Sequence, residues 1–554
     1  MVNRVGLIGS LLLTYSGINI ILASIVILLN RSIGGYILTI SFFITCLFCF
    51  FMIRKDSKLI KNLLINLAIV FLIIIGAVKL STIVYDFSYD GQAYHQEALI
   101  QLKSGWNPLY EEVVIDQGSQ GLWINHYAKG VWYLGTIVYD ATGKIESAKA
   151  FNYIILISTL LILLSYLQRK LNRWGISILL SILMIFSPVV INQLFTNYND
   201  FFIVLLLIIL TIGYLNYYEK LDISSLITIL FSIVLLVNIK FTALGYALVF
   251  TAIPILIILK NYYKPQLSHF NFKRKNIVSL GLLVVLAFFI GVALIGSTSY
   301  VKNTLTNGHP FYPLAGKGKV DIIGNNAPAA VKELNRVEKL YVSIFAESSN
   351  NIDTELKTKF PLSISEKEIF YSTATDTRIG GFGPLFGAIV ILVFCLVLVN
   401  YREFNKGDLW YISIIVFAIM VSVFINPETW WARYIPQLWL VPLLAVILTL
   451  RSKIKSYIQH VILFVYIVNI GIVGYSSVDS LLEKQYMLNK QFQILKEYNK
   501  EAPVAVELGV FIANRERLEE KGIIFNKVEN LEDCQNVLAL TYSTAKACLD
   551  KPKK

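Results

Sequence analysis

The chain has 554 residues, of which 56% are hydrophobic and only 15% are charged, and its formal net charge is +13. Soluble globular proteins are usually about 45–50% apolar and about 25% charged, so this composition excludes an ordinary cytosolic enzyme and a disordered protein. The basic residues lie between long apolar runs, a pattern that orients membrane proteins and excludes a nucleic-acid partner.

Thirteen apolar segments approach the length of about 20 residues that a membrane-spanning helix needs. They lie at 5–29, 34–53, 63–80, 151–167, 174–191, 201–217, 223–239, 243–259, 277–297, 383–400, 409–425, 435–450 and 457–475. The sequence therefore predicts an all-helical integral membrane protein with about thirteen spans.

Short basic loops set the expected orientation. With thirteen spans and a cytoplasmic N-terminus, four such loops fall on one side, which the positive-inside rule assigns to the cytoplasm. The loops contain Arg54, Lys55, Lys58 and Lys61; Arg169, Lys170 and Arg173; Lys260, Lys264, Lys273, Arg274 and Lys275; and Arg451, Lys453 and Lys455. We therefore expect a multi-pass protein of the cell (inner or plasma) membrane, with its N-terminus in the cytoplasm and its C-terminus outside.

Three long segments fall on the extracytoplasmic side: two loops at about 81–150 and 298–381, and the tail at 476–554. The tail begins with a helix-like stretch at 480–499, followed by strand-like segments at 504–508, 522–525 and 536–540. This pattern predicts a membrane domain at 1–475 and a small α/β domain at 476–554. Cys534 and Cys548 can pair there if the tail faces an oxidising compartment.

The first long loop opens with a dense group of polar side chains, from Asp86 through Asp90, Tyr94 and His95 to Glu97. If 90–102 is helical, Asp90, Tyr94 and Glu97 share one face, with Asp86 a turn earlier. A carboxylate held against apolar surface becomes more basic and can accept a proton from a hydroxyl. The alternative is an amphipathic helix at the membrane surface whose acids only face water.

Four further residues are candidates at the outer ends of apolar segments. Asp200 is either a helix N-cap or a second functional carboxylate, and with Asp90 it offers oxygen ligands for a divalent metal, the one cofactor considered. Lys240 and Arg433 lie outside against the charge bias, where they could bind a phosphate, and Lys240 could instead neutralise Asp200 or Asp86. The alternatives are a Lys240 that reaches the interface and an Arg433 paired with Glu428. His309, in a proline-rich turn, is a ligand or a structural residue.

No nucleotide-binding, hydrolase or zinc-binding motif occurs, which favours an activated donor delivered by the membrane. Five stretches resemble the GT-C superfamily of polytopic glycosyltransferases, which use polyprenyl-phosphate-linked sugars. Within it, the chain resembles bacterial relatives of the protein mannosyltransferases and lipid A aminoarabinose transferases. The stretches lie at 90–95, 199–200, 240–242, 309–313 and 433–436. The family usually places this loop after its first span, whereas two additional apolar segments precede it here.

The resemblance implies an inverting glycosyltransferase with an extracytoplasmic site. Asp90 would act as general base or orient the acceptor, Asp86 is a nearby second acid, and Asp200 corresponds to a later carboxylate. Lys240 and Arg433 would hold the lipid phosphate. Tyr94, His95, Glu97, His309 and Tyr434 complete the predicted substrate-binding residues.

The implied partners are a polyprenyl-phosphate sugar donor, a glycan, lipid or protein acceptor, and membrane lipid. The alternatives are an O-antigen-type polymerase or ligase, a lipid or sugar transporter (flippase), and a non-catalytic assembly subunit.

Overall fold

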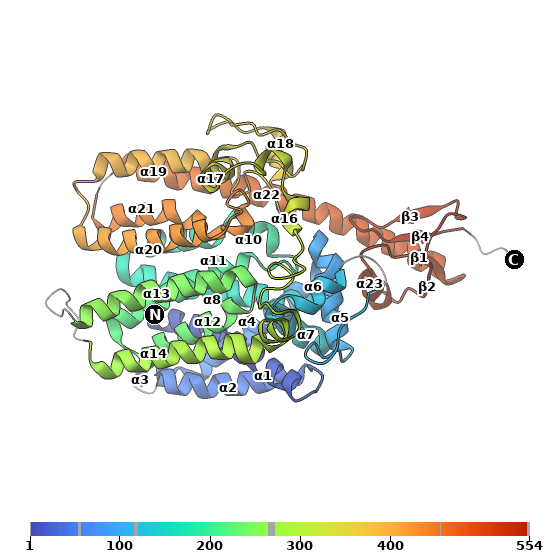
Figure 1. The fold of residues 1–554 in the computed structure, drawn as a ribbon, viewed down its shortest axis with the longest axis horizontal. Helices are drawn as coiled ribbons and strands as arrows, with labels where there is room; N and C mark the ends of the chain where they lie inside the picture. Colours follow the sequence, from blue (N-terminus) through green and yellow to red (C-terminus); the bar gives the residue numbers. More distant parts are fainter. Residues whose placement is uncertain (1, 54–56, 116–119, 264–271, 455, 551–554) are drawn as a thin grey trace.

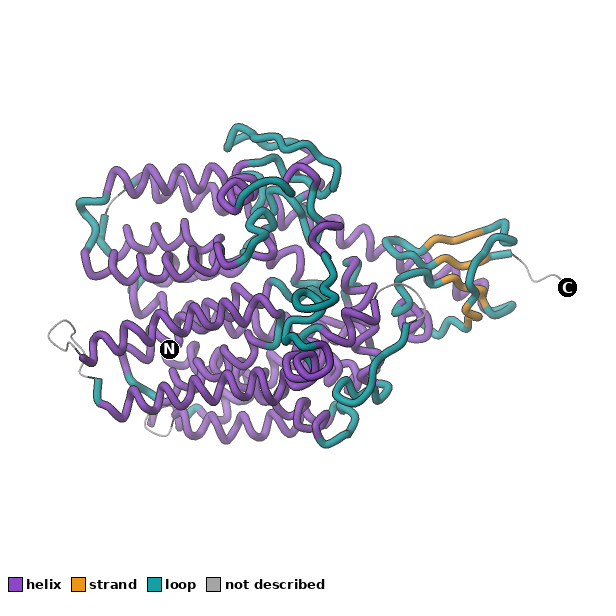
Figure 2. The backbone as a smooth tube through the Cα atoms, viewed as in Figure 1, coloured by secondary structure: helices purple, strands orange, loops and turns teal. Residues whose placement is uncertain are grey.

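The computed structural model describes residues 2–53, 57–115, 120–263, 272–454 and 456–550. Long helices lie side by side in one layered bundle, and a small sheet projects from one end (Figures 1 and 2). Within the described residues, nine helices are long and apolar enough to cross a membrane, as a multi-pass membrane protein requires. They are α1 (Val2–Leu28), α2 (Tyr36–Ile53), α4 (Leu63–Ile83), α8 (Ala150–Leu171), α11 (Phe201–Lys220), α13 (Phe241–Tyr263), α14 (Arg274–Phe289) together with the helical turns that continue it to Thr298, α20 (Lys406–Ile425) and α22 (Tyr457–Asn499).

Four shorter apolar helices complete the bundle: α9 (Trp174–Ile185), α12 (Ile223–Val237), α19 (Phe386–Asn400) and α21 (Leu440–Arg451). All thirteen predicted segments are therefore helical, but these four fall short of the roughly 20 residues that span a bilayer unaided. Short turns extend some helices: η4 (Ile290–Leu294) and η5 (Ile295–Thr298) follow α14, and η8 (Pro436–Trp439) precedes α21.

The remaining helices are short and lie mostly in the two long loops. They are α3 (Ser57–Lys61), η1 (Gly91–His95), α5 (Gln96–Lys103), α6 (Gln120–His126), α7 (Gly130–Thr142), η2 (Ile145–Lys149), α10 (Pro188–Gln193), α15 (Tyr300–Asn307), α16 (Ile322–Asn326), η6 (Ala329–Val331), α17 (Arg336–Phe345), α18 (Glu366–Tyr371) and η7 (Ala432–Tyr434).

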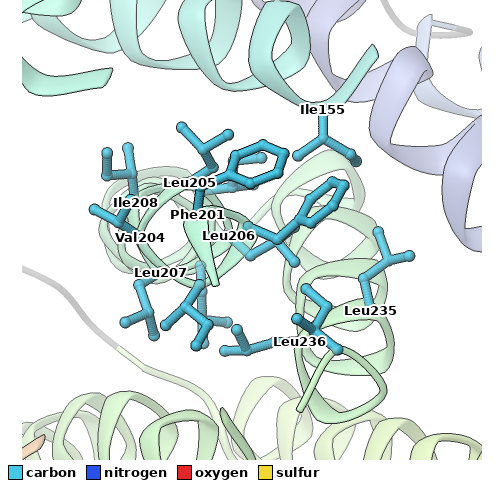
Figure 3. Close-up of a cluster of buried hydrophobic side chains, with 14 of the residues drawn as sticks. Ile155, Phe201, Val204, Leu205, Leu206, Leu207, Ile208, Leu235 and Leu236 are labelled. Carbon is cyan, nitrogen blue, oxygen red and sulfur yellow. The ribbon is translucent and has the colours of Figure 1, made fainter. Parts of the chain in front are cut away.

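Helix α11 forms the centre of the bundle because it is apolar on every side, and such a helix is stable only when other helices surround it. Figure 3 shows Phe201, Leu205 and Leu206 of α11 beside Ile155 of α8 and Leu235 of α12. The carboxylate-bearing N-terminus of α11 is therefore held by the most buried part of the protein.

The two ends of the bundle differ in composition. The C-terminal sheet and the long loop segments lie at one end (Figure 1). The helix ends at the opposite end carry the described basic residues Lys58, Lys61, Arg169, Lys170, Arg173, Lys260, Lys273, Arg274, Lys275, Arg451 and Lys453. Arg54, Lys55, Lys264 and Lys455 lie outside the described residues.

The C-terminal domain is carried by α22, which has 43 residues. At about 1.5 Å per residue this helix is about 65 Å long, roughly twice the thickness of a bilayer's hydrocarbon core. The predicted last span and the predicted tail helix are thus one continuous helix, which passes through the expected domain boundary at 475/476.

The domain's four strands are β1 (Val504–Glu507), β2 (Phe525–Lys527), β3 (Val537–Ala539) and β4 (Lys546–Cys548), and α23 (Asn514–Glu520) connects β1 to β2. The strand order is β2-β1-β4-β3, with β2 parallel to β1 and the other pairs antiparallel. Strands were expected at three of these places, although β2 begins only at the last residue of its predicted segment. A disulfide joins Cys534 to Cys548.

Candidate functional site

Two carboxylates and two cations from distant segments meet at the end of the bundle that bears the sheet. Arg433 Nη1 lies 3.7 Å from Asp90 Oδ2 and 3.6 Å from Asp200 Oδ2. Lys240 Nζ lies 2.6 Å from the other oxygen of Asp200. We call Asp90, Asp200, Lys240 and Arg433 the charged cluster.

Each member of the charged cluster sits at a helix end. Asp90 precedes η1, Asp200 precedes α11, Lys240 follows α12, and Arg433 lies in η7 between α20 and α21. Asp200 occupies the N-cap position of α11, but its side chain makes no capping hydrogen bond to that helix, so capping does not explain the carboxylate. Its carboxylate turns instead to Lys240 and to the Gln193 amide, at 3.4 Å.

The four side chains of the charged cluster differ in solvent exposure. Asp200 keeps 2% of its side chain exposed and Arg433 keeps 11%, whereas Asp90 and Lys240 keep 25% and 24%. Asp90 and Lys240 are therefore accessible from outside, and Asp200 lies beneath them. Of the charged cluster, Asp90 and Lys240 are thus the members most accessible to a ligand.

Arg433 is held by aromatic rings more than by hydrogen bonds. Its guanidinium carbon lies 4.0 Å from the ring centre of Trp431 and 5.3 Å from those of Tyr198 and Tyr434. Its contacts to the two carboxylates are longer than a hydrogen bond, and within the described part of the chain its buried Nε has no hydrogen-bond partner. A buried guanidinium with donors to spare is suited to bind an additional anion.

The alternative pairing of Arg433 with Glu428 does not occur. Glu428 instead accepts hydrogen bonds from Lys339, at 3.0 Å, and from the Trp430 indole, at 2.7 Å. Arg433 therefore stays available to the charged cluster.

The two carboxylates differ in basicity. Burial raises the pKa of Asp90 above its usual value, Arg433 opposes the rise, and Asp376 and Asp200 add to it. Although protein surrounds Asp90 on most sides, its side chain stays partly exposed, so protons can exchange there. Burial also acts on Asp200, but Lys240 and Arg433 outweigh it and hold the pKa of that carboxyl below its usual value. Asp200 is thus a permanent anion, and Asp90 is the better proton acceptor.

Tyr94 and His95 form an aromatic wall beside the cluster. Their ring centres are 4.3 Å apart, and the His95 ring lies 6.3 Å from that of Tyr198. Burial lowers the pKa of His95 to about 3, so its ring is neutral at physiological pH. Its Nδ1 accepts a hydrogen bond from the Trp132 indole at 2.7 Å, which leaves the proton on Nε2. His95 is therefore a hydrogen-bond donor and not a cation.

Tyr434 lies directly against Lys240, whose Nζ is 4.1 Å from the ring centre. The Tyr434 carbonyl accepts a hydrogen bond of 2.8 Å from the Tyr246 hydroxyl on α13. Because α13 begins just after Lys240, this bond fixes η7 to the segment that carries the lysine.

Three predicted site residues lie outside the cluster's contacts. Asp86 is fully buried and bonded to Ser88 and Asn197, and Glu97 pairs with Arg515 of the C-terminal domain at 2.7 Å. His309 Nδ1 accepts the Phe311 N–H within its own turn, at 3.1 Å. The expected shared face of Asp90, Tyr94 and Glu97 is wrong because η1 is a π-turn, which changes the angular spacing before α5 begins.

Several residues that contact or surround the cluster were not predicted as site residues. Tyr198 and Trp431 stack around Arg433, and Asp376 acts electrostatically on Asp90 from the second long loop. Tyr198 directly precedes the Asn199–Asp200 stretch, so its position was a usable signal. Asp376 lies in a polar loop without a motif, and nothing in the sequence distinguishes it.

The proposed metal ligands Asp90 and Asp200 already face a cation, because Arg433 Nη1 lies between them at 3.7 and 3.6 Å. A divalent ion held by both would have to displace this guanidinium. In the described residues, one group of three metal-type ligands is clustered, Cys534, Cys548 and Asp550, and its two cysteines form the disulfide. Metal binding by Asp90 and Asp200 stays a prediction.

In comparisons with protein-family models and with curated proteins, no family model and no curated protein matched this chain. The geometry of the charged cluster is therefore the observation from which a function can be inferred.

Proposed function

We propose that the chain is an integral membrane glycosyltransferase of the GT-C type, which moves a sugar from a polyprenyl-phosphate donor to an acceptor hydroxyl and inverts the anomeric centre. The observation that carries the proposal is the charged cluster. It joins a partly exposed carboxylate of raised pKa to two cations, one of them a buried arginine whose Nε has no hydrogen-bond partner among the residues that the structure describes. A proton acceptor beside an anion site is what a transfer from a sugar phosphate requires.

The proposed reaction is a single displacement. The acceptor oxygen attacks the anomeric carbon as Asp90 takes the hydroxyl proton, and the bond from that carbon to the phosphate oxygen breaks. The polyprenyl phosphate leaves with the bonding electrons, and Arg433 and Lys240 offset its charge. Asp200 keeps Lys240 and Arg433 in place through its contacts of 2.6 and 3.6 Å. The ring of Tyr94, which is partly exposed, would offer an apolar face to the sugar, and the buried rings of His95 and Tyr198 would support it from behind.

The proposed orientation places the basic helix ends in the cytoplasm and the charged cluster outside, with thirteen segments crossing the membrane. The disulfide between Cys534 and Cys548 supports this orientation, because disulfides persist in oxidising compartments. The four shorter helices would cross with the help of their flanking turns, as α21 does with η8 before it.

The test is a transfer assay with purified protein in liposomes and a radiolabelled polyprenyl-phosphate sugar. We expect label to move to an acceptor with the wild type, and Asp90→Asn to lower kcat by roughly 10²–10⁴-fold, the usual contribution of a general base. Asp140→Asn serves as a control, because Asp140 is exposed and bonds only the Gly35 N–H. Near-normal transfer by Asp90→Asn would refute the base assignment. Movement of intact labelled lipid across the bilayer, without transfer, would favour the transporter alternative.

A further inference from the structure

The C-terminal domain reaches the backbone of the segment that carries Asp90. Arg517 of α23 is 2% exposed, and its guanidinium makes bonds to four residues, three of them outside α23. Nη2 donates to the Asp86 carbonyl at 2.6 Å, Nη1 donates to the Gln92 side chain at 3.0 Å, and Nε donates to Glu146 at 2.8 Å. Arg517 thus bonds the chain both before and after Asp90, at Asp86 and at Gln92.

Two charged residues of η2, Glu146 and Lys149, bind the backbone at Val84 and Asp86. Glu146 accepts the Asp86 N–H at 3.0 Å, and Lys149 pairs with Glu146 and donates to the Val84 carbonyl at 2.6 Å. Lys149 and Glu146 are 1% and 2% exposed. Buried ion groups of this kind add little net stability because desolvation offsets their attraction. Their contribution here is to fix the backbone where it leaves α4.

The path from Asp86 to Asp90 leaves little freedom. One Asp86 oxygen accepts bonds from the N–H and hydroxyl of Ser88, at 2.8 and 2.5 Å. A Cβ added at Gly91 would lie 2.1 Å from the other Asp86 oxygen, so only glycine fits there. Gln92 is bonded at both ends of its amide, to Arg517 and to the Tyr542 carbonyl at 2.9 Å. Asp90 therefore lies between fixed points at Asp86 and Gln92.

We propose that Arg517 is a positioning residue for Asp90, so that the C-terminal domain completes the active site instead of only capping it. The inference rests on the proposed function for its catalytic consequence. Arg515, on the same helix, provides a natural contrast. It makes a two-pronged ion pair with Glu97 on α5, at 2.7 and 2.9 Å, and bonds no residue between Val84 and Gln92. Both arginines attach the domain, but only Arg517 holds the Asp90 segment.

The experiment compares Arg517→Gln, Arg517→Lys and Arg515→Gln in the full-length protein. We expect both Arg517 variants to lower kcat by about 100-fold, the effect of a misplacement of about 1 Å, with the KM for the donor unchanged. Lysine fails as well because one ammonium cannot reproduce three bonds of a planar fork. Arg515→Gln should keep kcat within about threefold of the wild type. It should lower the melting temperature about as much as the Arg517 variants do.

Hydrogen exchange provides a second measurement that needs no substrate. Amides at 84–92 should exchange faster in Arg517→Gln than in the wild type and in Arg515→Gln. If Arg517→Gln does not fold, Gln92→Ala removes the contact between Arg517 and Gln92 together with the bond from Gln92 to the Tyr542 carbonyl, and it keeps the bond from Arg517 to Glu146. A loss of kcat and of amide protection in this variant would support the proposal that the C-terminal domain positions the Asp90 segment.

The outcomes separate the two proposals. Unchanged kcat in the Arg517 variants, or an equal loss in Arg515→Gln, would overturn the positioning role. If the wild type transfers no sugar, the proposed function fails, and hydrogen exchange alone decides the inference. Wild-type protection at 84–92 in Arg517→Gln would then overturn it.

Discussion

Asn197 donates two hydrogen bonds to one oxygen of Asp86, at 2.7 Å from its backbone nitrogen and at 2.8 Å from its side-chain amide. The bond pair joins the segment after α4 to the segment before α11. Asp90 lies four residues after Asp86, and Asp200 lies three residues after Asn197. The bonds of Asp86 therefore fix the segments that carry the two carboxylates of the charged cluster relative to each other. Asp86 has a structural role, which its position close to Asp90 in the sequence does not indicate.

Asp86→Asn is expected to destabilise the protein. The carboxylate is fully buried and accepts bonds from Asn197 and Ser88 on both oxygens, so an amide would turn an NH₂ group toward donors. We expect a loss of roughly 1–3 kcal/mol in the free energy of unfolding, measured by thermal or denaturant unfolding in detergent. Asp140→Asn at an exposed position should change it by less than about 0.5 kcal/mol. Wild-type stability of Asp86→Asn would contradict the assignment.

The pH dependence of transfer should report Asp90. The base must be ionised, and its pKa is raised by burial, so the rate should fall as pH drops through a value above the ordinary aspartate range. Arg433 opposes that rise, so Arg433→Gln should move the acid limb to higher pH. Initial rates from about pH 4 to pH 8 test both statements. An acid limb that stays in place in Arg433→Gln would disprove the coupling.

Arg433→Lys should weaken donor binding although the charge is kept. Lysine loses the planar fork and the stacking on Trp431, whose ring centre lies 4.0 Å from the guanidinium. We expect about a 10- to 100-fold weaker affinity for polyprenyl phosphate, which corresponds to about 1–3 kcal/mol. Binding of labelled polyprenyl phosphate measures this, with the exposed Arg336→Lys as control. Equal affinities would exclude a phosphate contact by Arg433.

Acid should destabilise the protein through His95. The folded-state pKa is about 3 because of burial, and the ordinary value is 6.5, so the folded state binds fewer protons between them. The stabilisation is complete above pH 6.5 and is lost as pH falls toward 3. His95→Gln lacks this titration, so its melting temperature should fall less than that of the wild type on acidification. His460→Gln, at an exposed position, should follow the wild type. Parallel curves for all three proteins would show that His95 does not titrate this way.

Removal of the disulfide should loosen the sheet. Cys534 and Cys548 are 14 residues apart, and β4 pairs with both β1 and β3. Closing a loop of this size stabilises a fold by about 3 kcal/mol. The double variant Cys534→Ser/Cys548→Ser should therefore lose amide protection in β3 and β4, measured by hydrogen exchange. Cys395→Ser, a free and exposed cysteine, is the control. Unchanged protection would show that the strands hold without the bridge.

The membrane helices were predictable because their signal is local: each is a continuous apolar run. The four shorter helices were not distinguished, because their apolar runs in the sequence are about as long as those of several spanning helices. The cluster residues Lys240 and Arg433 were identified because each departs from the charge bias around it. The roles of Asp86 and Glu97 were not predictable. Their partners Asn197 and Arg515 lie 111 and 418 residues away, and no local pattern encodes such pairs. The π-turn of η1 also lacks a sequence signature, so the shared face of Asp90, Tyr94 and Glu97 was predicted wrongly.

Arg517 and Asp86 are 431 residues apart. At roughly 5–20 residues per second, a ribosome needs between roughly 20 and 90 s to travel that distance. During synthesis the segment around Asp90 emerges before α23 and waits that long for the guanidinium that binds it. An incomplete chain that stops before α23 contains all four residues of the charged cluster and still cannot form the bonds to Asp86 and Gln92. This part of the site can therefore form only after α23 has been synthesised.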